Sequence, residues 1–205
     1  MHVLIIYANP NPNSLNAAML AQVKRGLEDS NHSYTLIDLY EEHFDPVLQI
    51  NENKKRSEMK CDKVMKKYQD LVREADHMIF LYPLWWYGPP AILKGFFDRV
   101  FVSGIAYTYE GALPKGLLKA KSAWVMYTCD SPGWFVQIIR RNAEWIVMRD
   151  GILKFCGIQK VKRFRFAGVK SSSEAKRKRW LDEIYSRVRY QLKNGQSQAN
   201  AATRK

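Results

Sequence analysis

Three segments of the sequence combine residue types that suit a flat, anionic ligand. They are Ala8–Ser14, Tyr82–Pro90 and Thr128–Trp134, and each follows an apolar run. The first offers amides and a hydroxyl, the second three consecutive aromatic rings, and the third hydroxyls with a carboxylate. Together they indicate binding of a ring compound that carries a phosphate.

The first segment begins the stretch ANPNPNSLN, which leads directly into a predicted helix. Free backbone amides and the helix dipole attract anions at a helix N-terminus. Asn9, the hydroxyl of Ser14 and the amide of Asn16 add polar groups there. The chain contains neither GxGxxG nor GxxxxGK[ST], so the usual dinucleotide and nucleoside-triphosphate fingerprints are absent. A capped helix behind a loop of prolines and asparagines explains the same residues without a ligand.

The second segment lies within LYPLWWYGPPAILKGFFDRVF and places Trp85, Trp86 and Tyr87 in a loop. Large aromatic faces could stack on a planar ligand while backbone amides meet its polar edge. Gly88 and the two prolines after it are expected to turn the chain tightly beside them. A dimer interface or a satellite core is the alternative explanation.

The third segment, within YTCDSPGWF, offers the hydroxyls of Thr128 and Ser131 and the carboxylate of Asp130. Gly133 permits close approach of a backbone or ligand. Cys129 could be reactive at a strand end, but a buried, inert thiol is the favoured interpretation.

Several catalytic schemes are absent from the sequence. There is no HExxH motif, the four histidines are scattered, and no metal site is expected. There is no GxSxG nucleophile elbow and no tight pair of carboxylates. The pattern therefore favours a cofactor that carries the chemistry.

Alternating strands and helices must position these segments. Apolar runs predict five strands, and stripes at helical spacing predict the intervening helices. A capping box at residues 171–174 precedes the last helix, which is marked by apolar residues from Leu181 to Leu192. The strands are expected at His2–Tyr7, Tyr34–Leu39, His77–Leu81, Ala123–Thr128 and Lys162–Phe166, and the other helices at 14–29, 64–75, 91–102 and 135–148.

Five alternations of strand and helix predict a doubly wound α/β fold with a parallel sheet and helices on both faces. The flavodoxin-like strand order 2-1-3-4-5 is the leading expectation, and ligands then bind beyond the carboxyl ends of the strands. We expect one domain over residues 1–193. Residues 194–205 are polar and are expected to be a disordered tail.

Composition limits the class of protein. Hydrophobic residues make up 46% of the 205 residues, which suits a globular core, and no apolar run is long enough for a membrane span. Three separated cysteines without a CxxC pair, and the lack of a signal peptide, indicate a reducing cytoplasm. The net charge is +13, and residues 101–205 hold 21 Lys and Arg against 7 Asp and Glu. No nucleic-acid motif accompanies this charge, so nucleic acid is not the expected partner.

The stretch YPLWWYGPPAILKGFFDRVF with GIAYTYEG closely resembles the flavin-dependent NAD(P)H:quinone oxidoreductases of flavodoxin-like fold. NSLNAAM in the first segment and ILKFCGI at Ile152–Ile158 are similar to the same family. The resemblance covers the chain from Val3 to about Leu192. It implies a homodimer that binds one flavin per subunit and passes hydride from NAD(P)H to a quinone-like acceptor.

The resemblance also implies roles for residues. Ser14, Leu15 and Asn16 match the phosphate-binding turn of the family. In the family, a further loop faces the polar edge of the flavin ring. Thr128, Cys129, Asp130 and Ser131 match that loop. Tyr107 and Tyr109 match tyrosines that reach the partner's substrate pocket, and Tyr127 is a further catalytic candidate just before the third segment. The segment that lies along the flavin ring is matched by Pro83, Leu84, Trp85, Trp86, Tyr87 and Gly88.

The sequence departs from the family at several positions. Asn9 stands where many relatives have histidine, and Asp130 and Ser131 replace glycines. Residues 134–145 lack the histidine and tyrosine of the longer members, so no proton relay is assigned. FAD is favoured by the double-aromatic segment, and FMN remains the alternative. Other functions of the same fold are an azo- or nitro-compound reductase, or a flavin-binding regulatory subunit of a membrane potassium-efflux transporter.

Overall fold

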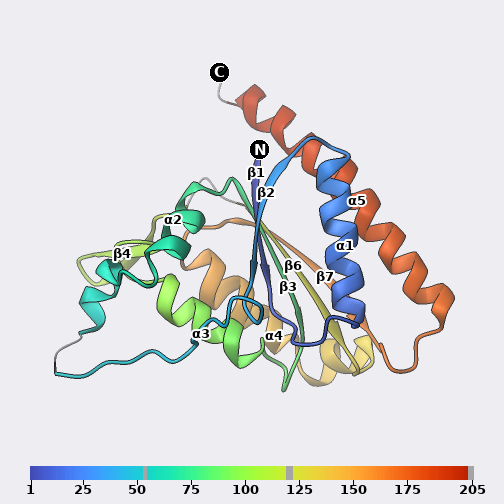
Figure 1. Cartoon of the computed structure of the whole chain (residues 1–205), viewed down its shortest axis with the longest axis horizontal. Helices are drawn as coiled ribbons and strands as arrows, with labels where there is room; N and C mark the ends of the chain where they lie inside the picture. The colour runs from blue at the N-terminus through green and yellow to red at the C-terminus, as the bar shows by residue number, and fades with distance from the viewer. Residues whose placement is uncertain (53–54, 119–121, 203–205) are drawn as a thin grey trace.

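The computed structural model describes residues 1–52, 55–118 and 122–202, apart from the side chains of residue 57 and of residues 193–202. It is a three-layer α/β structure in which one parallel sheet lies between two groups of helices (Figure 1). Helices α1 (Leu15–Glu28) and α5 (Glu174–Ala202) cover one face, and α2 (Lys66–Glu74) and α3 (Ala91–Val100) cover the other (Figure 1).

The remaining elements complete the two layers. The helical ones are η1 (Arg56–Cys61, a 3-10 helix), η2 (Phe135–Ile139) and η3 (Val147–Lys154), which are π-helical, and the short helix α4 (Ala143–Ile146). The strands are β1 (His2–Tyr7), β2 (Ser33–Asp38), β3 (His77–Pro83), β4 (Tyr107–Glu110), β5 (Leu113–Gly116), β6 (Ser122–Cys129) and β7 (Lys160–Ala167).

The main sheet has the order β2-β1-β3-β6-β7, and every pairing in it is parallel. With the hairpin β4–β5 set aside, this is the flavodoxin-like order 2-1-3-4-5, so the predicted fold is confirmed. The pairing of Pro83 with Thr128 brings the ends of β3 and β6 to the same level. The second and third predicted segments therefore start side by side.

The core occupies both faces of the sheet because the central strands are covered twice. Along β1, Leu4 and Ile6 face the layer of α2 and α3, whereas Val3 and Ile5 face the layer of α1 and α5. All four are fully buried. This explains why the strand is a continuous apolar run and does not alternate with polar residues.

The first and last helices of the domain pack directly on each other. A Cβ on Gly26 of α1 would lie 2.9 Å from Val188 of α5, so the close approach requires glycine. At the end of α1, the hydroxyl of Tyr185 donates to the carboxylate of Asp29 over 2.6 Å. The predicted tail at residues 194–205 lies outside the residues whose side chains the structure describes, and its disorder stays a prediction.

The single helix predicted over Phe135–Met148 is wrong. The chain forms the short π-helical turn η2, reverses through Arg141 and Asn142 with φ of 49° and 52°, and then starts α4. The apolar spacing alone does not distinguish these two arrangements, because both bury one face. A glycine in the sequence would have indicated left-handed backbone at this point, whereas other residue types adopt it without such an indication.

The antiparallel hairpin β4–β5 is absent from the predicted elements. Its strands have four residues each and are largely exposed, so they lack a buried stripe. The hairpin is held to the end of η3 by backbone contact. A Cβ on Gly116 would lie 2.3 Å from the nitrogen of Gly157, so no side chain fits between them.

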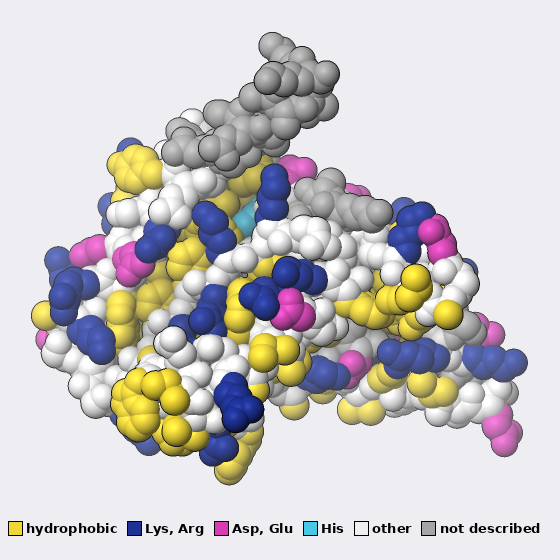
Figure 2. Space-filling view, turned by 180° about the vertical axis from the view of Figure 1, so that it is seen from behind, with side chains coloured by type: hydrophobic (Ala, Val, Ile, Leu, Met, Phe, Trp, Pro, Cys, Tyr) yellow, Lys and Arg dark blue, Asp and Glu magenta, His cyan; other side chains and the backbone are white. Residues whose placement is uncertain are grey.

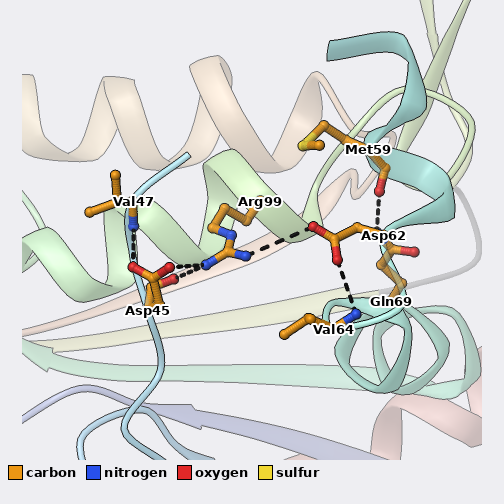
Figure 3. Close-up of polar contacts among 7 residues, drawn as sticks. All are labelled: Asp45, Val47, Met59, Asp62, Val64, Gln69 and Arg99. Atoms are coloured by element: carbon orange, nitrogen blue, oxygen red, sulfur yellow. Dashed lines mark hydrogen bonds and ion pairs between the residues drawn. The ribbon is translucent and has the colours of Figure 1, made fainter. Parts of the chain in front are cut away.

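A loop after β2 crosses α3 and is clamped there (Figure 3). The guanidinium of Arg99, which is 7% exposed, donates to the carboxylate of Asp45 over 2.8 Å and lies 3.8 Å from that of Asp62. A Cβ on Gly95 would lie 2.3 Å from the carbonyl oxygen of Pro46. The loop and the helix backbone are therefore in direct contact.

The described residues contain neither a helix suited to crossing a membrane nor a cluster suited to holding a metal ion. None of the helices there is both long and apolar enough to cross a membrane. Among the same residues, no cluster of histidine, cysteine, aspartate and glutamate could hold a metal ion.

Candidate functional site

The three predicted segments meet at one edge of the sheet. They follow β1, β3 and β6, which are adjacent and parallel, so all three leave the sheet at the same end (Figure 1, lower edge). This edge includes the switch in strand order between β1 and β3, where doubly wound folds bind ligands.

The first segment is a series of tight turns that ends in a capped helix. The side chain of Asn9 accepts from the amide of Asn11 over 2.8 Å, and Asn11 accepts from Asn13 over 2.9 Å. Ser14 is the N-cap of α1, because its hydroxyl accepts from the amide of Ala17 over 3.1 Å. Asn9 and Ser14 thus have structural roles that the sequence analysis had named as the alternative to ligand binding.

Asn16 joins the first segment to the third. The hydroxyl of Thr128 donates to its side-chain oxygen over 2.7 Å, and the two residues are only 2% and 8% exposed. The side-chain nitrogen of Asn16 is buried, and it has no partner in the part of the chain that the structure describes. A buried donor without a partner is costly, so this amide fits an acceptor atom on a bound ligand.

The second segment is a tight turn made by the aromatic residues themselves. Trp85 and Gly88 exchange two backbone hydrogen bonds of 3.0 and 2.9 Å, and Trp86 and Tyr87 occupy the turn with φ of 51° and 58°. Gly88 was expected to make the turn, but it only closes it. Leu84 donates its amide to the carbonyl of Thr128 over 2.8 Å, which ties the start of the turn to β6.

This aromatic turn is strained and open to solvent. Left-handed backbone costs an ordinary residue about 1–2 kcal/mol, and two such residues follow each other here. The side chain of Trp86 is fully exposed, and that of Trp85 is 43% exposed. Packing within the chain therefore does not explain Trp86, and strained, exposed residues of this kind cluster at functional sites.

The third segment contacts the second through side chains. The hydroxyls of Tyr87 and Ser131 share a hydrogen bond of 3.2 Å. Asp130 is exposed and lies 3.9 Å from the ammonium group of Lys170. Cys129 is 6% exposed and points its thiol at the carbonyl of Ser131, and burial raises its pKa. These features agree with the inert thiol favoured above.

Tyr127 faces away from the other site residues. Its ring is buried and stacks on Tyr82 with 5.9 Å between centroids, and its hydroxyl donates to Glu144 over 2.6 Å. Burial first, and then the neighbouring carboxylate, raise the pKa of Tyr127. The arrangement supports a structural role for this tyrosine in the layer of α3 and α4, where Arg163 lies 3.4 Å from the same carboxylate.

Glu144 was missed by the sequence analysis. It is only 3% exposed, and it accepts the hydroxyl of Tyr127 besides its ion pairs. A single glutamate between Ala143 and Trp145 in an apolar helical pattern gave no indication of burial.

Tyr107 and Tyr109 lie on β4, at a distance from the three segments. Figure 1 shows the hairpin on the far side of α3 from the edge where the segments meet. Tyr107 packs against Phe155 with 4.9 Å between ring centroids, and Tyr109 is 56% exposed. Within one chain, the structure does not bring these tyrosines to the predicted site.

A hollow of about 630 Å³ adjoins the hairpin and the end of η3. Its lining contains none of the residues predicted for the site, so it does not mark that site. The predicted site instead carries exposed apolar side chains such as Trp86, and Figure 2 shows hydrophobic side chains exposed at several places on the face that it draws. We call the following side chains, each at least 50% exposed, the apolar patch: Trp86, Trp134, Ile138, Ile139, Ile146 and Val147.

Arg140 also reaches this edge and was not predicted. Its guanidinium carbon lies 4.9 Å from the centre of the Tyr87 ring and 5.4 Å from that of Phe135. The expectation of one continuous helix over this segment gave the side chain no particular position. Only the left-handed reversal after η2 sets it there.

Comparison with known proteins agrees with this architecture. The chain is 30% identical over 190 residues to an uncharacterised NAD(P)H oxidoreductase of Haemophilus influenzae, over 89% of this chain and 91% of that protein. It is 31% identical over 216 residues to the ribosyldihydronicotinamide dehydrogenase (quinone) of Mus musculus, over 91% and 90% of the two chains. The crystal structure of Smu.1420 from Streptococcus mutans matches with a TM-score of 0.87 and 42% identity, over 92% of this chain and 99% of that one.

The model of one protein family spans nearly the whole described domain. It matches residues 1–191, from the first residue of the chain into α5. The chain belongs to the family described as having the flavodoxin-like fold.

Proposed function

We propose that this protein is a flavin-dependent NAD(P)H:quinone oxidoreductase. The observation that carries the proposal is the aromatic turn, where Trp86 and Tyr87 are held in left-handed backbone beside the switch point of the sheet. Two of the related proteins described above are named for NAD(P)H or quinone chemistry, which supports the same reaction class here.

The residues at the sheet edge fit a flavin. The first turn of α1 has free backbone amides, and the buried nitrogen of Asn16 has no partner among the described residues. Asn9, Ser14, Leu15 and Asn16 would hold the phosphate side of the cofactor. The ring would lie along Pro83, Leu84, Trp85, Trp86, Tyr87 and Gly88, with its polar edge toward Thr128, Cys129, Asp130 and Ser131.

A bound flavin would supply the hydride chemistry, in a ping-pong exchange in which the oxidised nicotinamide, NAD(P)+, leaves before a quinone enters. The chain's own residues orient two flat substrates in turn against one aromatic wall. The hydroxyl of Ser131 would accommodate charge at the polar edge of the ring, since the amide of Leu84 and the hydroxyl of Thr128 already donate within the chain.

The active form is proposed to be a homodimer. The six side chains of the apolar patch are each at least half exposed, and exposed apolar patches mark interaction sites. In a dimer, Tyr107 and Tyr109 would enter the site of the partner subunit, since they do not reach the site of their own chain. Ile138→Glu is expected to shift the protein to monomers in sedimentation velocity. If Ile138→Glu remains a dimer, the apolar patch is not part of the dimer interface.

The central experiment measures quinone-dependent oxidation of NADH and NADPH by the flavin-loaded protein. Parallel double-reciprocal plots are expected from the ping-pong exchange. Heat release of the flavin followed by chromatography identifies it, with FAD expected and FMN as the alternative. A protein that takes up neither flavin, or takes one up without reducing quinones, would refute the proposal.

A further inference from the structure

Arg140 is a cation placed where the second and third segments meet. Its guanidinium lies over the ring of Tyr87, whose hydroxyl in turn bonds to that of Ser131. It also lies over the ring of Phe135 in η2. The contacts place a positive charge directly beside the aromatic wall to which we assign the flavin and its substrates.

The backbone fixes the base of this side chain. The amide of Arg140 donates to the carbonyl of Phe135 over 3.1 Å and closes the π-helical turn. Its own carbonyl accepts from Ala143 over 2.9 Å, across the left-handed residues Arg141 and Asn142. The residue therefore sits at a defined reversal of the chain and not along a continuous helix.

Three arginines of this region are paired with carboxylates, whereas no ion pair of Arg140 or of its neighbour Arg141 is found among the described residues. Arg163 and Arg165 lie 3.4 and 3.8 Å from Glu144, and Arg149 lies 2.7 Å from Asp150. In the part of the chain that the structure describes, no ion pair involves Arg140. Two aromatic rings contact its guanidinium instead.

Arg140 also makes a side-chain hydrogen bond to Tyr87, which helps to lower the pKa of that tyrosine, and a guanidinium that stacks on rings keeps its other in-plane N–H donors available. These donors suit a planar or tetrahedral oxyanion, and arginine is the preferred residue for such groups. The Arg140 side chain is exposed, so a ligand can reach its charge and salt screens it. Trp134 and Ile138 of the apolar patch are close in sequence to it.

We propose that Arg140 recognises an anionic oxygen group carried by the flat substrates of this site. The group is either a sulfonate or carboxylate on the electron acceptor, or a phosphate on the nicotinamide donor. The inference rests on the proposed function and extends it to substrate class. It assigns a specificity role to a residue that takes no part in hydride transfer.

The test compares Arg140→Gln with Arg141→Gln in the flavin-loaded protein. Both variants remove one positive charge, and Arg141 serves as the matched control because it is adjacent and exposed. The acceptors are 2-methyl-1,4-naphthoquinone and 1,4-naphthoquinone-2-sulfonate, and each is measured with NADH and with NADPH.

Arg140→Gln is expected to lower the ratio of kcat/KM for the charged against the uncharged substrate by about three- to tenfold, the range for an accessible charge-assisted contact. A change in the sulfonate ratio identifies the acceptor as the source of the anion, and a change in the NADPH to NADH ratio identifies the donor. The loss should appear in KM, shrink with added salt, and be partly rescued in Arg140→Lys. Unchanged ratios, or equal changes in Arg141→Gln, would overturn the inference.

A binding measurement separates this inference from the proposed function. Quenching of tryptophan fluorescence by the same two naphthoquinones requires no turnover. If the wild-type protein reduces no quinone, the proposed function fails, while Arg140→Gln must still weaken binding of the sulfonate relative to its uncharged counterpart. Equal binding of both compounds by wild type and variant would refute the role of Arg140 in either case.

Discussion

The strain in the aromatic turn leads to a quantitative prediction. Trp86 has φ of 51° and a fully exposed side chain, so replacing it removes no packing within the chain. Trp86→Ala removes the ring but keeps a Cβ in the left-handed region. Trp86→Gly removes both, which relieves about 1–2 kcal/mol of strain and costs about 0.5–1 kcal/mol of extra chain entropy. The glycine variant is therefore expected to be more stable than the alanine variant by about 1 kcal/mol.

Urea unfolding of the two flavin-free variants, followed by circular dichroism, measures this difference. In thermal unfolding it corresponds to about 2–4 °C for a domain of this size. Both variants should lose flavin affinity by a similar factor, of about two- to tenfold, because both lose the same aromatic face. An alanine variant that is as stable as the glycine variant would refute the claim that strain is stored at this position.

Three further predictions concern the scaffold and its titration. Gly95→Ala should destabilise the protein by about 2 kcal/mol or more in urea unfolding, because its Cβ would overlap the crossing loop, while Gly151→Ala, with open space around its Cβ, should be neutral or stabilising. Arg99→Met should cost about 1–3 kcal/mol because it leaves the clamped loop without its cation, whereas Lys94→Gln, at an exposed ion pair, should change the free energy of unfolding by less than about 1 kcal/mol. Burial raises the pKa of Cys156 from 9.0 to about 12. The buried neutral thiol stabilises the folded protein fully below pH 9.0. As the pH rises from 9.0 toward 12, only the unfolded chain ionises this thiol, and stability falls by about 1.4 kcal/mol per pH unit. Cys156→Ala should therefore lose less stability than wild type over that range, and parallel curves for the two proteins would contradict this.

The sheet and its binding edge were predictable because their residues carry periodic patterns. The sequences of β1 and β3 are continuous apolar runs, which are typical of parallel strands covered by helices on both faces. Alternation with helices then places the loops after β1, β3 and β6 at one edge. The contact between Asn16 and Thr128 was not predictable, although both residues were named, because nothing in the sequence relates two side chains 112 positions apart.

The aromatic turn and the reversal after η2 were missed for the same physical reason. Trp86, Tyr87, Arg141 and Asn142 all adopt left-handed backbone without being glycine. Local propensity opposes this conformation, so only tertiary contacts can impose it. Since Arg140 is positioned by two of these residues, the sequence analysis could not place it at the site.

The packing of α5 on α1 has a consequence for synthesis of the chain on the ribosome. Val23 and Leu27 of α1 belong to the core cluster that Ile184 and Val188 of α5 complete. The beginning of the chain therefore emerges from the exit tunnel long before its covering helix exists. Domains fold as units during translation, so this layer can close only after the turns of α5 that carry Ile184 and Val188 have been released, and until then the nascent chain offers an apolar surface to chaperones.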